Sequence, residues 1–202
     1  MPRIIAGEAR GIKLDSSKED LMRPTADRVK EAIFSSLQAQ IKQGQIKSFL
    51  DLFAGSGQIG LEAKSRGVAR VVMVENNRRQ LATIKRNIAK SKLKVELLSR
   101  PAEFALKSLL AGEELFDIIY LDPPWPSWPD FWAGQSKQIK GLLSPGGQVL
   151  LECSKKQELA ISSKIWEIVR QKDYGLTRCL KLMPRRQEGL SEENNSHEDL
   201  AL

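Results

Sequence analysis

The stretch that decides the fold is Phe49-Leu50-Asp51-Leu52-Phe53-Ala54-Gly55-Ser56-Gly57-Gln58-Ile59-Gly60. A short apolar run leads into a glycine-rich turn and then into a helix predicted from Ile59 to Arg66. Gly55, Gly57 and Gly60 match the G-x-G-x-x-G pattern in the strand–turn–helix context that this pattern requires. Such glycines let a ligand approach the backbone and let the helix pack on the strand. The alternative is a tightly packed turn that binds no ligand.

An acidic residue supports a ligand at this turn. The next predicted strand, Arg70 to Glu75, ends in an acid twenty positions after Gly55. In nucleotide-binding α/β folds, an acid at that distance accepts hydrogen bonds from ribose hydroxyls. The glycines, the strand and the acid together predict a cofactor that contains adenosine, and NAD and S-adenosylmethionine both satisfy this prediction.

Strands and helices alternate along most of the chain, which predicts a doubly wound, Rossmann-like α/β sheet. Apolar periodicity predicts helices near residues 25–41, 59–66, 79–91, 103–110, 131–143 and 156–162, and strands near 49–53, 70–75, 95–98, 116–121, 148–152, 165–171 and 176–183. A turn is expected at 145–147, between the fifth helix and the fifth strand. The last two strands follow each other without a full helix, so we expect an antiparallel hairpin at the sheet edge.

A second motif, Leu121-Asp122-Pro123-Pro124-Trp125, follows the strand predicted over 116–121. Its prolines end that strand, because neither can donate to a sheet ladder. Asp122 and the Pro123 carbonyl can both accept hydrogen bonds from an exocyclic amino group, which suits methylation of that nitrogen. Trp125 offers a face on which a base can stack. A plain strand-ending turn is the alternative.

This second motif favours S-adenosylmethionine over NAD. Hydride transfer usually needs a His, Lys or Tyr acid–base group, and the single histidine, His197, lies in a polar tail. Four aromatic residues also gather after the motif. We expect Phe131 and Trp132 to be core residues at the start of a helix, and Trp125 and Trp128 to lie in a loop where they can stack on a base.

Composition narrows the setting of the protein. The chain has 202 residues, of which 41% are apolar and 28% charged, so it can bury a sizeable core and should be soluble. No apolar run approaches the ~20 residues of a membrane span, and the N-terminus is too polar for a signal peptide. Cys153 and Cys179 have no motif spacing, which favours a reducing cytoplasm and argues against a metal site. We expect a cytoplasmic monomer without metal or membrane partner.

Charge points to nucleic acid as the partner. All 32 basic residues lie within 1–186, where they face 20 acidic ones, so this part carries +12 within a total of +7. An excess of that size favours a polyanion. A hairpin is predicted over residues 3–14 and is expected to be an appendage. Its cations, Arg3, Arg10 and Lys13, form a candidate basic arm with Arg23 at the entry to the first helix. Thr25, which can cap that helix, is a further substrate-binding candidate. The alternative is that the charges are simply solvated.

Four motifs occur in an order that resembles one family. They are Arg3-Ile4-Ile5-Ala6-Gly7, Arg23-Pro24-Thr25 with Asp27-Arg28-Val29, Asp51 to Gly57, and Asp122-Pro123-Pro124. The chain resembles the bacterial 16S rRNA (guanine-N2)-methyltransferase family, ribosomal small-subunit methyltransferase D, over roughly residues 1–185. The resemblance implies a seven-stranded methyltransferase sheet with a late antiparallel strand. It also implies methyl transfer from S-adenosylmethionine to the N2 of one guanine in a partly assembled small ribosomal subunit.

The resemblance also implies roles for single residues. Asp51, Phe53, Ala54, Gly55, Ser56 and Gly57 would hold the methionine part of the cofactor, and Glu75 with Asn76 its ribose. Asp122 and Pro123 would hold the guanine amino group beside Trp125, with Trp128 and the basic arm on the RNA side. The chain departs from the family where Trp125 replaces the commoner Tyr or Phe, and where Glu103 stands in for an adenine-side Asp.

Three segments and two alternatives complete the prediction. We expect an N-terminal extension over 1–22, a methyltransferase domain over 23–186 and a disordered acidic tail over 187–202. The residues alone do not separate guanine N2 from adenine N6 or cytosine N4. A non-catalytic RNA-binding assembly factor on the same fold is the alternative from another class.

Overall fold

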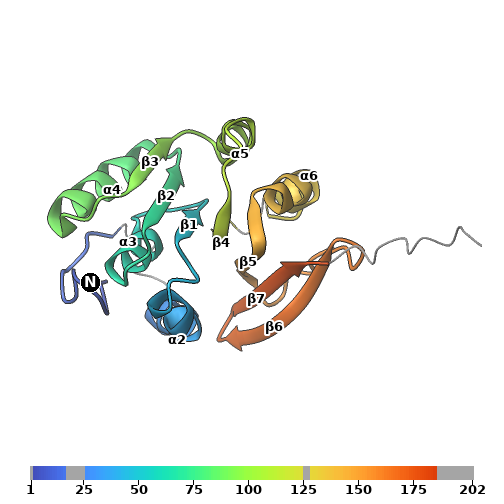
Figure 1. Cartoon of the computed structure of the whole chain (residues 1–202), viewed down its shortest axis with the longest axis horizontal. Coiled ribbons are helices and arrows are strands. Elements are labelled where there is room, and N and C mark those ends of the chain that lie inside the picture. The colour runs from blue at the N-terminus through green and yellow to red at the C-terminus, as the bar shows by residue number, and fades with distance from the viewer. Residues whose placement is uncertain (1, 17–25, 125–127, 186–202) are drawn as a thin grey trace, which may run out of the picture.

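The computed structural model describes residues 2–16, 26–124 and 128–185. Seven strands form one mixed sheet in the order β3-β2-β1-β4-β5-β7-β6 (Figure 1). Their bounds are β1 Ser48–Asp51, β2 Arg70–Glu75, β3 Glu96–Ser99, β4 Phe116–Leu121, β5 Leu143–Ser154, β6 Trp166–Tyr174 and β7 Thr177–Pro184. Strands β1 to β5 are parallel, whereas β7 is antiparallel to both β5 and β6. The predicted doubly wound sheet with a late antiparallel hairpin is confirmed.

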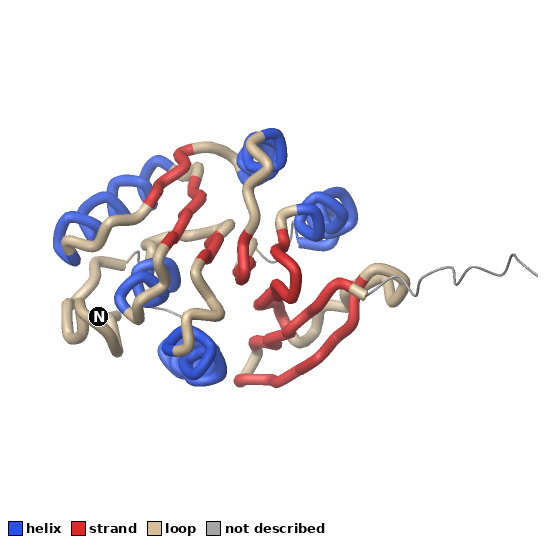
Figure 2. The backbone as a smooth tube through the Cα atoms, viewed as in Figure 1, coloured by secondary structure: helices blue, strands red, loops and turns tan. Residues whose placement is uncertain are grey.

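Helices cover both faces of this sheet (Figure 2). They are α2 (Ala26–Lys42), α3 (Gln58–Ser65), α4 (Arg78–Ser91), α5 (Ala102–Ala111) and α6 (Trp128–Gly141). Helices α5 and α6 pack in one apolar cluster, and α2, α3 and α4 pack in another on the opposite face. The sequence of α2 explains why this helix packs against the sheet. Its apolar residues Val29, Ile33, Leu37 and Ile41 recur every fourth position, so all four are buried on one side of the helix.

Residues 2–16 fold back on themselves and pack against α3. Arg3 and Lys13 form an antiparallel bridge, which confirms the predicted pairing. Ile4 and Leu14 are buried in the same cluster as α2, α3 and α4, and the buried carboxylate of Glu62 accepts hydrogen bonds from two backbone amides of the segment. The segment belongs to the core, which corrects the expectation of an appendage. The boundary predicted at residue 22 lies outside the described residues.

Two local predictions were wrong. No helix forms over 156–162, because Leu159 and Ile161 pack individually against the α6 cluster and the backbone makes turn hydrogen bonds instead of a helical ladder. The turn expected at 145–147 falls inside β5, which begins at Leu143 and shifts register opposite residues 116–118. Over the described part of the chain, no helix is both long and apolar enough to cross a membrane. The predicted tail, 187–202, lies outside it.

Candidate active site

Three neighbouring strands end at one edge of the sheet with an acid at or just beyond each end. Strand β1 lies between β2 and β4, with Asp51 opposite Met73 on one side and Tyr120 on the other. The ends of these strands therefore bring Asp51, Glu75 and Asp122 to the same edge. This is also the point where the strand order reverses, which is where open α/β sheets bind ligands.

The glycine loop is held in place by Glu75. Gly55 and Gly57 have φ values of 56° and 82°, which glycine adopts without a steric penalty. One carboxylate oxygen of Glu75 accepts a hydrogen bond from the Gly55 N–H at 2.8 Å. The other accepts from the N–H groups of Asn76 and Asn77, at 2.8 and 2.7 Å. The acid predicted to face the cofactor thus also shapes the loop.

The three glycines of the motif do different work. A Cβ added at Gly57 would lie 2.7 Å from Ile84, and one at Gly60 would lie 2.5 Å from the sulfur of Met73. These two glycines allow α3 to pack closely. A Cβ at Gly55 would meet nothing within 4 Å, so this glycine borders open space that a ligand can enter. The turn therefore serves both packing and ligand access.

Asp51 combines full burial with one carboxylate oxygen that lacks a hydrogen-bond partner within the described residues. Its side chain is 1% exposed, and its Oδ2 accepts from the Gly60 N–H at 3.0 Å. Its Oδ1 has no hydrogen-bond partner within the described residues. Burial, together with the charges of Asp122 and Glu75, raises the pKa of Asp51 to about 7. A cationic group placed at Oδ1 would satisfy the atom and restore its charge.

A cleft joins the glycine loop to the Asp122 motif. It has a volume of about 320 Å3 and is lined by Phe53, Glu103, Pro123, Asp130, Phe131 and Gln135. The rings of Phe53 and Phe131 meet edge to face at 5.0 Å. Phe131, predicted to be core, is only partly buried and faces this cleft. Glu103, the candidate adenine-side acid, lies in the first turn of α5 on the same cleft.

Trp128 is not available for stacking on a base, which corrects our prediction. It begins α6 and is fully buried, with its ring 5.4 Å from that of Trp132. Trp128, Trp132 and Ile139 form the buried stripe of the helix, whereas Phe131 and Gln135 form the stripe beside it that lines the cleft. Helical spacing counted from residue 128 would have found this division.

Tyr120 and Glu152 form a buried polar pair that the sequence did not reveal. The phenol of Tyr120 donates to Oε1 of Glu152, and both side chains are almost fully buried on adjacent strands. Burial first, and then the charge of Glu152, raises the pKa of Tyr120. Tyr120 lies two residues before Asp122, so the pair underlies the motif. The signal was an acid near the end of an apolar strand, as at Asp51 and Glu75.

The remaining predicted residues fall into three groups. Ala54 and Ser56 are buried within the loop, and Asn76 is exposed beside it. Arg3, Arg10 and Lys13 are exposed on the N-terminal segment, where the described residues provide no ion-pair partner. Arg23, Thr25 and Trp125 lie outside the described ranges. In those ranges, no group of three His, Cys, Asp or Glu residues is arranged to hold a metal ion.

The chain as a whole is similar to proteins of a known family. The family model described as "Conserved hypothetical protein 95" matches residues 2–182. Ribosomal RNA small subunit methyltransferase D of Haemophilus influenzae is 32% identical over 86% of this chain and 89% of its own length. The chain belongs to this methyltransferase D family. The putative rRNA methyltransferase YlbH of Bacillus subtilis is 31% identical over 87% of this chain and 95% of that relative.

Solved structures agree with this family assignment. The putative methyltransferase yhhF from Escherichia coli superposes with a TM-score of 0.75, at 27% identity, over 92% of this chain and 98% of that one. The fold is that of S-adenosylmethionine-dependent methyltransferases, as predicted. The residues present fit this cofactor: Gly55 borders open space, Asp51 offers a free buried acceptor for its ammonium group, and Glu75 stands where ribose hydroxyls are bound in such folds.

Proposed function

We propose that this protein transfers a methyl group from S-adenosylmethionine to the exocyclic N2 amino group of one guanine in 16S rRNA, within a partly assembled small ribosomal subunit. The observation that carries the proposal is the convergence of Asp51, Gly55 and Asp122 on one strand edge. The first two fit a cofactor with a cationic amino acid part, and the third suits an amino substrate. The names of the relatives support rRNA as the substrate.

Each group of the site has a separate task in this proposal. The cofactor, when bound, supplies an electrophilic methyl group. Asp51 would bind its ammonium group, and Glu75 would orient its ribose while holding the loop. Asp122 and the carbonyl of Pro123 would accept hydrogen bonds from the guanine amino group, which aligns a weak nucleophile and favours the positive charge that it develops. No strong general base is needed, because the proton can leave after the methyl group has transferred.

In this proposal, the planar base binds in the cleft beside the Asp122 motif. Phe53 and Phe131 line it, with Pro123 at the motif and Glu103 on the side of α5. The aromatic part of this cleft would exclude water from the reacting nitrogen and strengthen the hydrogen bonds that hold it. The family resemblance is what favours guanine N2 over the other exocyclic amino groups.

The test uses labelled S-adenosylmethionine and small-subunit particles that lack the modification. We expect label in 16S rRNA, at N2 of a single guanine, when the product is digested to nucleosides and the labelled nucleotide is mapped. Naked 16S rRNA, assayed in parallel, should be the poorer substrate. Label on adenine N6 or cytosine N4 would contradict the choice of base. Binding to particles without any label would favour the non-catalytic assembly factor.

A further inference from the structure

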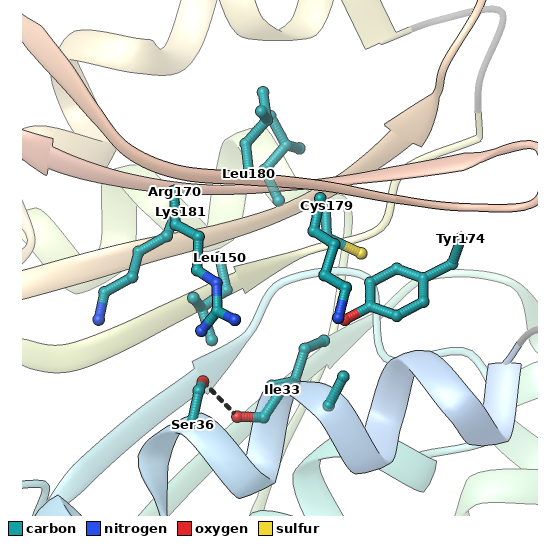
Figure 3. A pocket seen from close by; sticks show the side chains of 11 residues that line it. Ile33, Ser36, Leu150, Arg170, Tyr174, Cys179, Leu180 and Lys181 are labelled. Atoms are coloured by element: carbon teal, nitrogen blue, oxygen red, sulfur yellow. Dashed lines mark hydrogen bonds between the residues drawn. The ribbon is translucent and has the colours of Figure 1, made fainter.

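A second pocket lies away from the catalytic edge, between α2 and the β6–β7 hairpin. It has a volume of about 50 Å3, and its lining includes Ser36 of α2, Leu150 of β5, and Arg170, Lys172, Tyr174 and Lys181 of the hairpin. Figure 3 shows Arg170, Tyr174, Cys179 and Lys181 extending from the hairpin toward the helix. We refer to this pocket as the hairpin groove. Its volume is several times the ~10–15 Å3 that one water needs, so it suits a group as small as a phosphate.

The charges of the hairpin groove are arranged unfavourably for the protein alone. Arg170 of β6 stands directly opposite Lys181 of β7, and like charges in this position repel each other. Lys172 lies two residues beyond Arg170 on the same face of the strand. Within the described part of the chain, no carboxylate lines the groove and none of the three cations has an ion-pair partner.

The pKa of Lys181 also reflects the unfavourable placement of these charges. Partial burial, and then the nearby charge of Arg170, lower the pKa of Lys181. An anion bound between the two side chains would remove both effects. Ser36 of α2 faces them across the groove; its hydroxyl donates to the Ile33 carbonyl, which leaves its oxygen able to accept but not to donate (Figure 3). The charged donors in the groove are therefore the hairpin cations, with the Tyr174 hydroxyl beside them.

The hairpin groove lies close enough to Asp122 for one RNA strand to contact both. Lys181 pairs with Leu150 of β5, which pairs with Tyr120 of β4, and Asp122 lies two residues beyond Tyr120. With about 3.3 Å per residue along a strand and about 4.8 Å between strands, the Cα atoms of Lys181 and Asp122 lie roughly 12 Å apart. That is too far for the target base and suits the phosphates that flank it.

We propose that the hairpin groove binds a backbone phosphate of the RNA strand beside the nucleotide held at Asp122, with Arg170 and Lys181 as its ligands. This inference rests on the proposed function, because it assumes that RNA reaches the catalytic edge. It differs from the basic arm formed by Arg3, Arg10 and Lys13, which lies against α3 on the other side of α2.

The test compares two double variants that remove the same charge. Arg170→Gln with Lys181→Gln empties the hairpin groove of its facing cations. Lys85→Gln with Lys94→Gln removes one exposed lysine of α4 and one from the turn that leads into β3, the strand at the opposite end of the sheet. Affinity for small-subunit particles is measured over a series of salt concentrations, together with S-adenosylmethionine affinity and the kinetics of methylation.

We expect only the groove variant to change RNA binding. Its slope of log affinity against log salt should fall by about 0.7 to 0.9 for each phosphate that is no longer neutralised, and affinity near 0.1 M salt by about fivefold or more. KM for particles should rise while kcat and cofactor affinity stay near those of the unaltered protein, because the phosphate is held equally before and during the reaction. The charge-keeping pair Arg170→Lys with Lys181→Arg should retain the original slope.

Two results would overturn the inference. Unchanged affinity and slope in the groove variant would leave the groove without a role in RNA binding. Equal losses of affinity in both double variants would assign the effect to total charge and not to this site. Failure of the proposed function is a different result: the unaltered protein itself would then not methylate or bind the particles, and the inference would fall with it.

Discussion

The carboxylate of Glu75 accepts a 2.8 Å hydrogen bond from the backbone N–H of Gly55, twenty positions earlier in the chain. The same side chain therefore fixes the glycine loop and stands at the place of the cofactor ribose. Loop shape and cofactor affinity are coupled through this one residue, so its substitution reports on both.

Replacing Glu75 should weaken cofactor binding. Glu75→Ala should cost about 1.5–3 kcal/mol of S-adenosylmethionine binding free energy, because a charge-assisted hydrogen bond is removed. Glu75→Gln should weaken binding less, since its amide oxygen can still accept from the N–H groups of Asn76 and Asn77. Isothermal calorimetry measures both, with Glu96→Ala on the neighbouring strand as the control. Unchanged affinity in Glu75→Ala, or tight NAD binding by the unaltered protein, would contradict the cofactor assignment.

Gly55 gives a test that separates ligand access from packing. Gly55→Val should nearly abolish S-adenosylmethionine binding, because its side chain would occupy the open space beside the loop. Its effect on stability should be limited to the strain of a left-handed backbone, on the order of 1–2 kcal/mol. Gly60→Ala should instead reduce the unfolding midpoint more strongly, since its Cβ meets Met73. Calorimetry measures cofactor affinity and urea unfolding measures stability, so together they distinguish the two variants. Normal cofactor affinity in Gly55→Val would contradict the placement of the cofactor beside Gly55.

Cofactor affinity should depend on pH through Asp51. Its pKa is raised to about 7 in the free protein, and a bound ammonium group favours the ionised form. Below pH 7 binding must therefore expel a proton, so affinity should fall by up to about tenfold per pH unit. Above about pH 8 affinity should fall again as the cofactor amino group loses its charge. Calorimetry in buffers of different ionisation enthalpy counts the protons released, and Asp51→Asn should bind weakly with no release below pH 7.

Asp122 should control methyl transfer but not cofactor binding. Asp122→Ala should lower the methylation rate by about 100-fold or more, as loss of a positioned polar group often does. Asp122→Asn should retain some rate, because its carbonyl can still accept from the amino group. Single-turnover transfer of labelled methyl measures the rate, and Glu167→Ala, at an exposed acid of β6 outside the cleft, is the control. Full turnover by Asp122→Ala would show that Asp122 is not part of the active site.

The basic N-terminal residues should contribute to RNA affinity. Replacing Arg3, Arg10 and Lys13 by Gln should lower the salt slope of particle binding by about 0.7–0.9 for each phosphate that these cations neutralise, with cofactor affinity unchanged. Substitution is a better test than deletion of residues 1–14, which would also remove the buried Ile4 and Leu14. Removing residues after Arg186 should leave binding unchanged or slightly stronger. If the triple variant binds with the original slope, these charges are only solvated.

The sequence predicted what depends on backbone periodicity and short motifs. Strand β2 has the bounds that the sequence predicts, and Glu75 and the Asp122 motif lie at the ends of strands where the sequence places them. The features that the sequence did not predict depend on contacts between residues that are far apart in the chain. The burial of Trp128 depends on where α6 begins, and the Tyr120–Glu152 pair on which strands are neighbours. The N-terminal segment was predicted to be separate because its partner, Glu62, lies far along the chain.

The packing at Glu62 also has a consequence for synthesis. Residues 2–16 pack against α3, and the amide and carboxylate of Asp15 bind Asn87, Arg86 and Lys90 of α4. The segment leaves the ribosome before any of these partners exist. At about 5–20 residues per second, Asp15 waits roughly 4–15 s until α4 has been made. The buried Ile4 and Leu14 are exposed during this interval, so residues 2–16 cannot reach their native positions as they emerge.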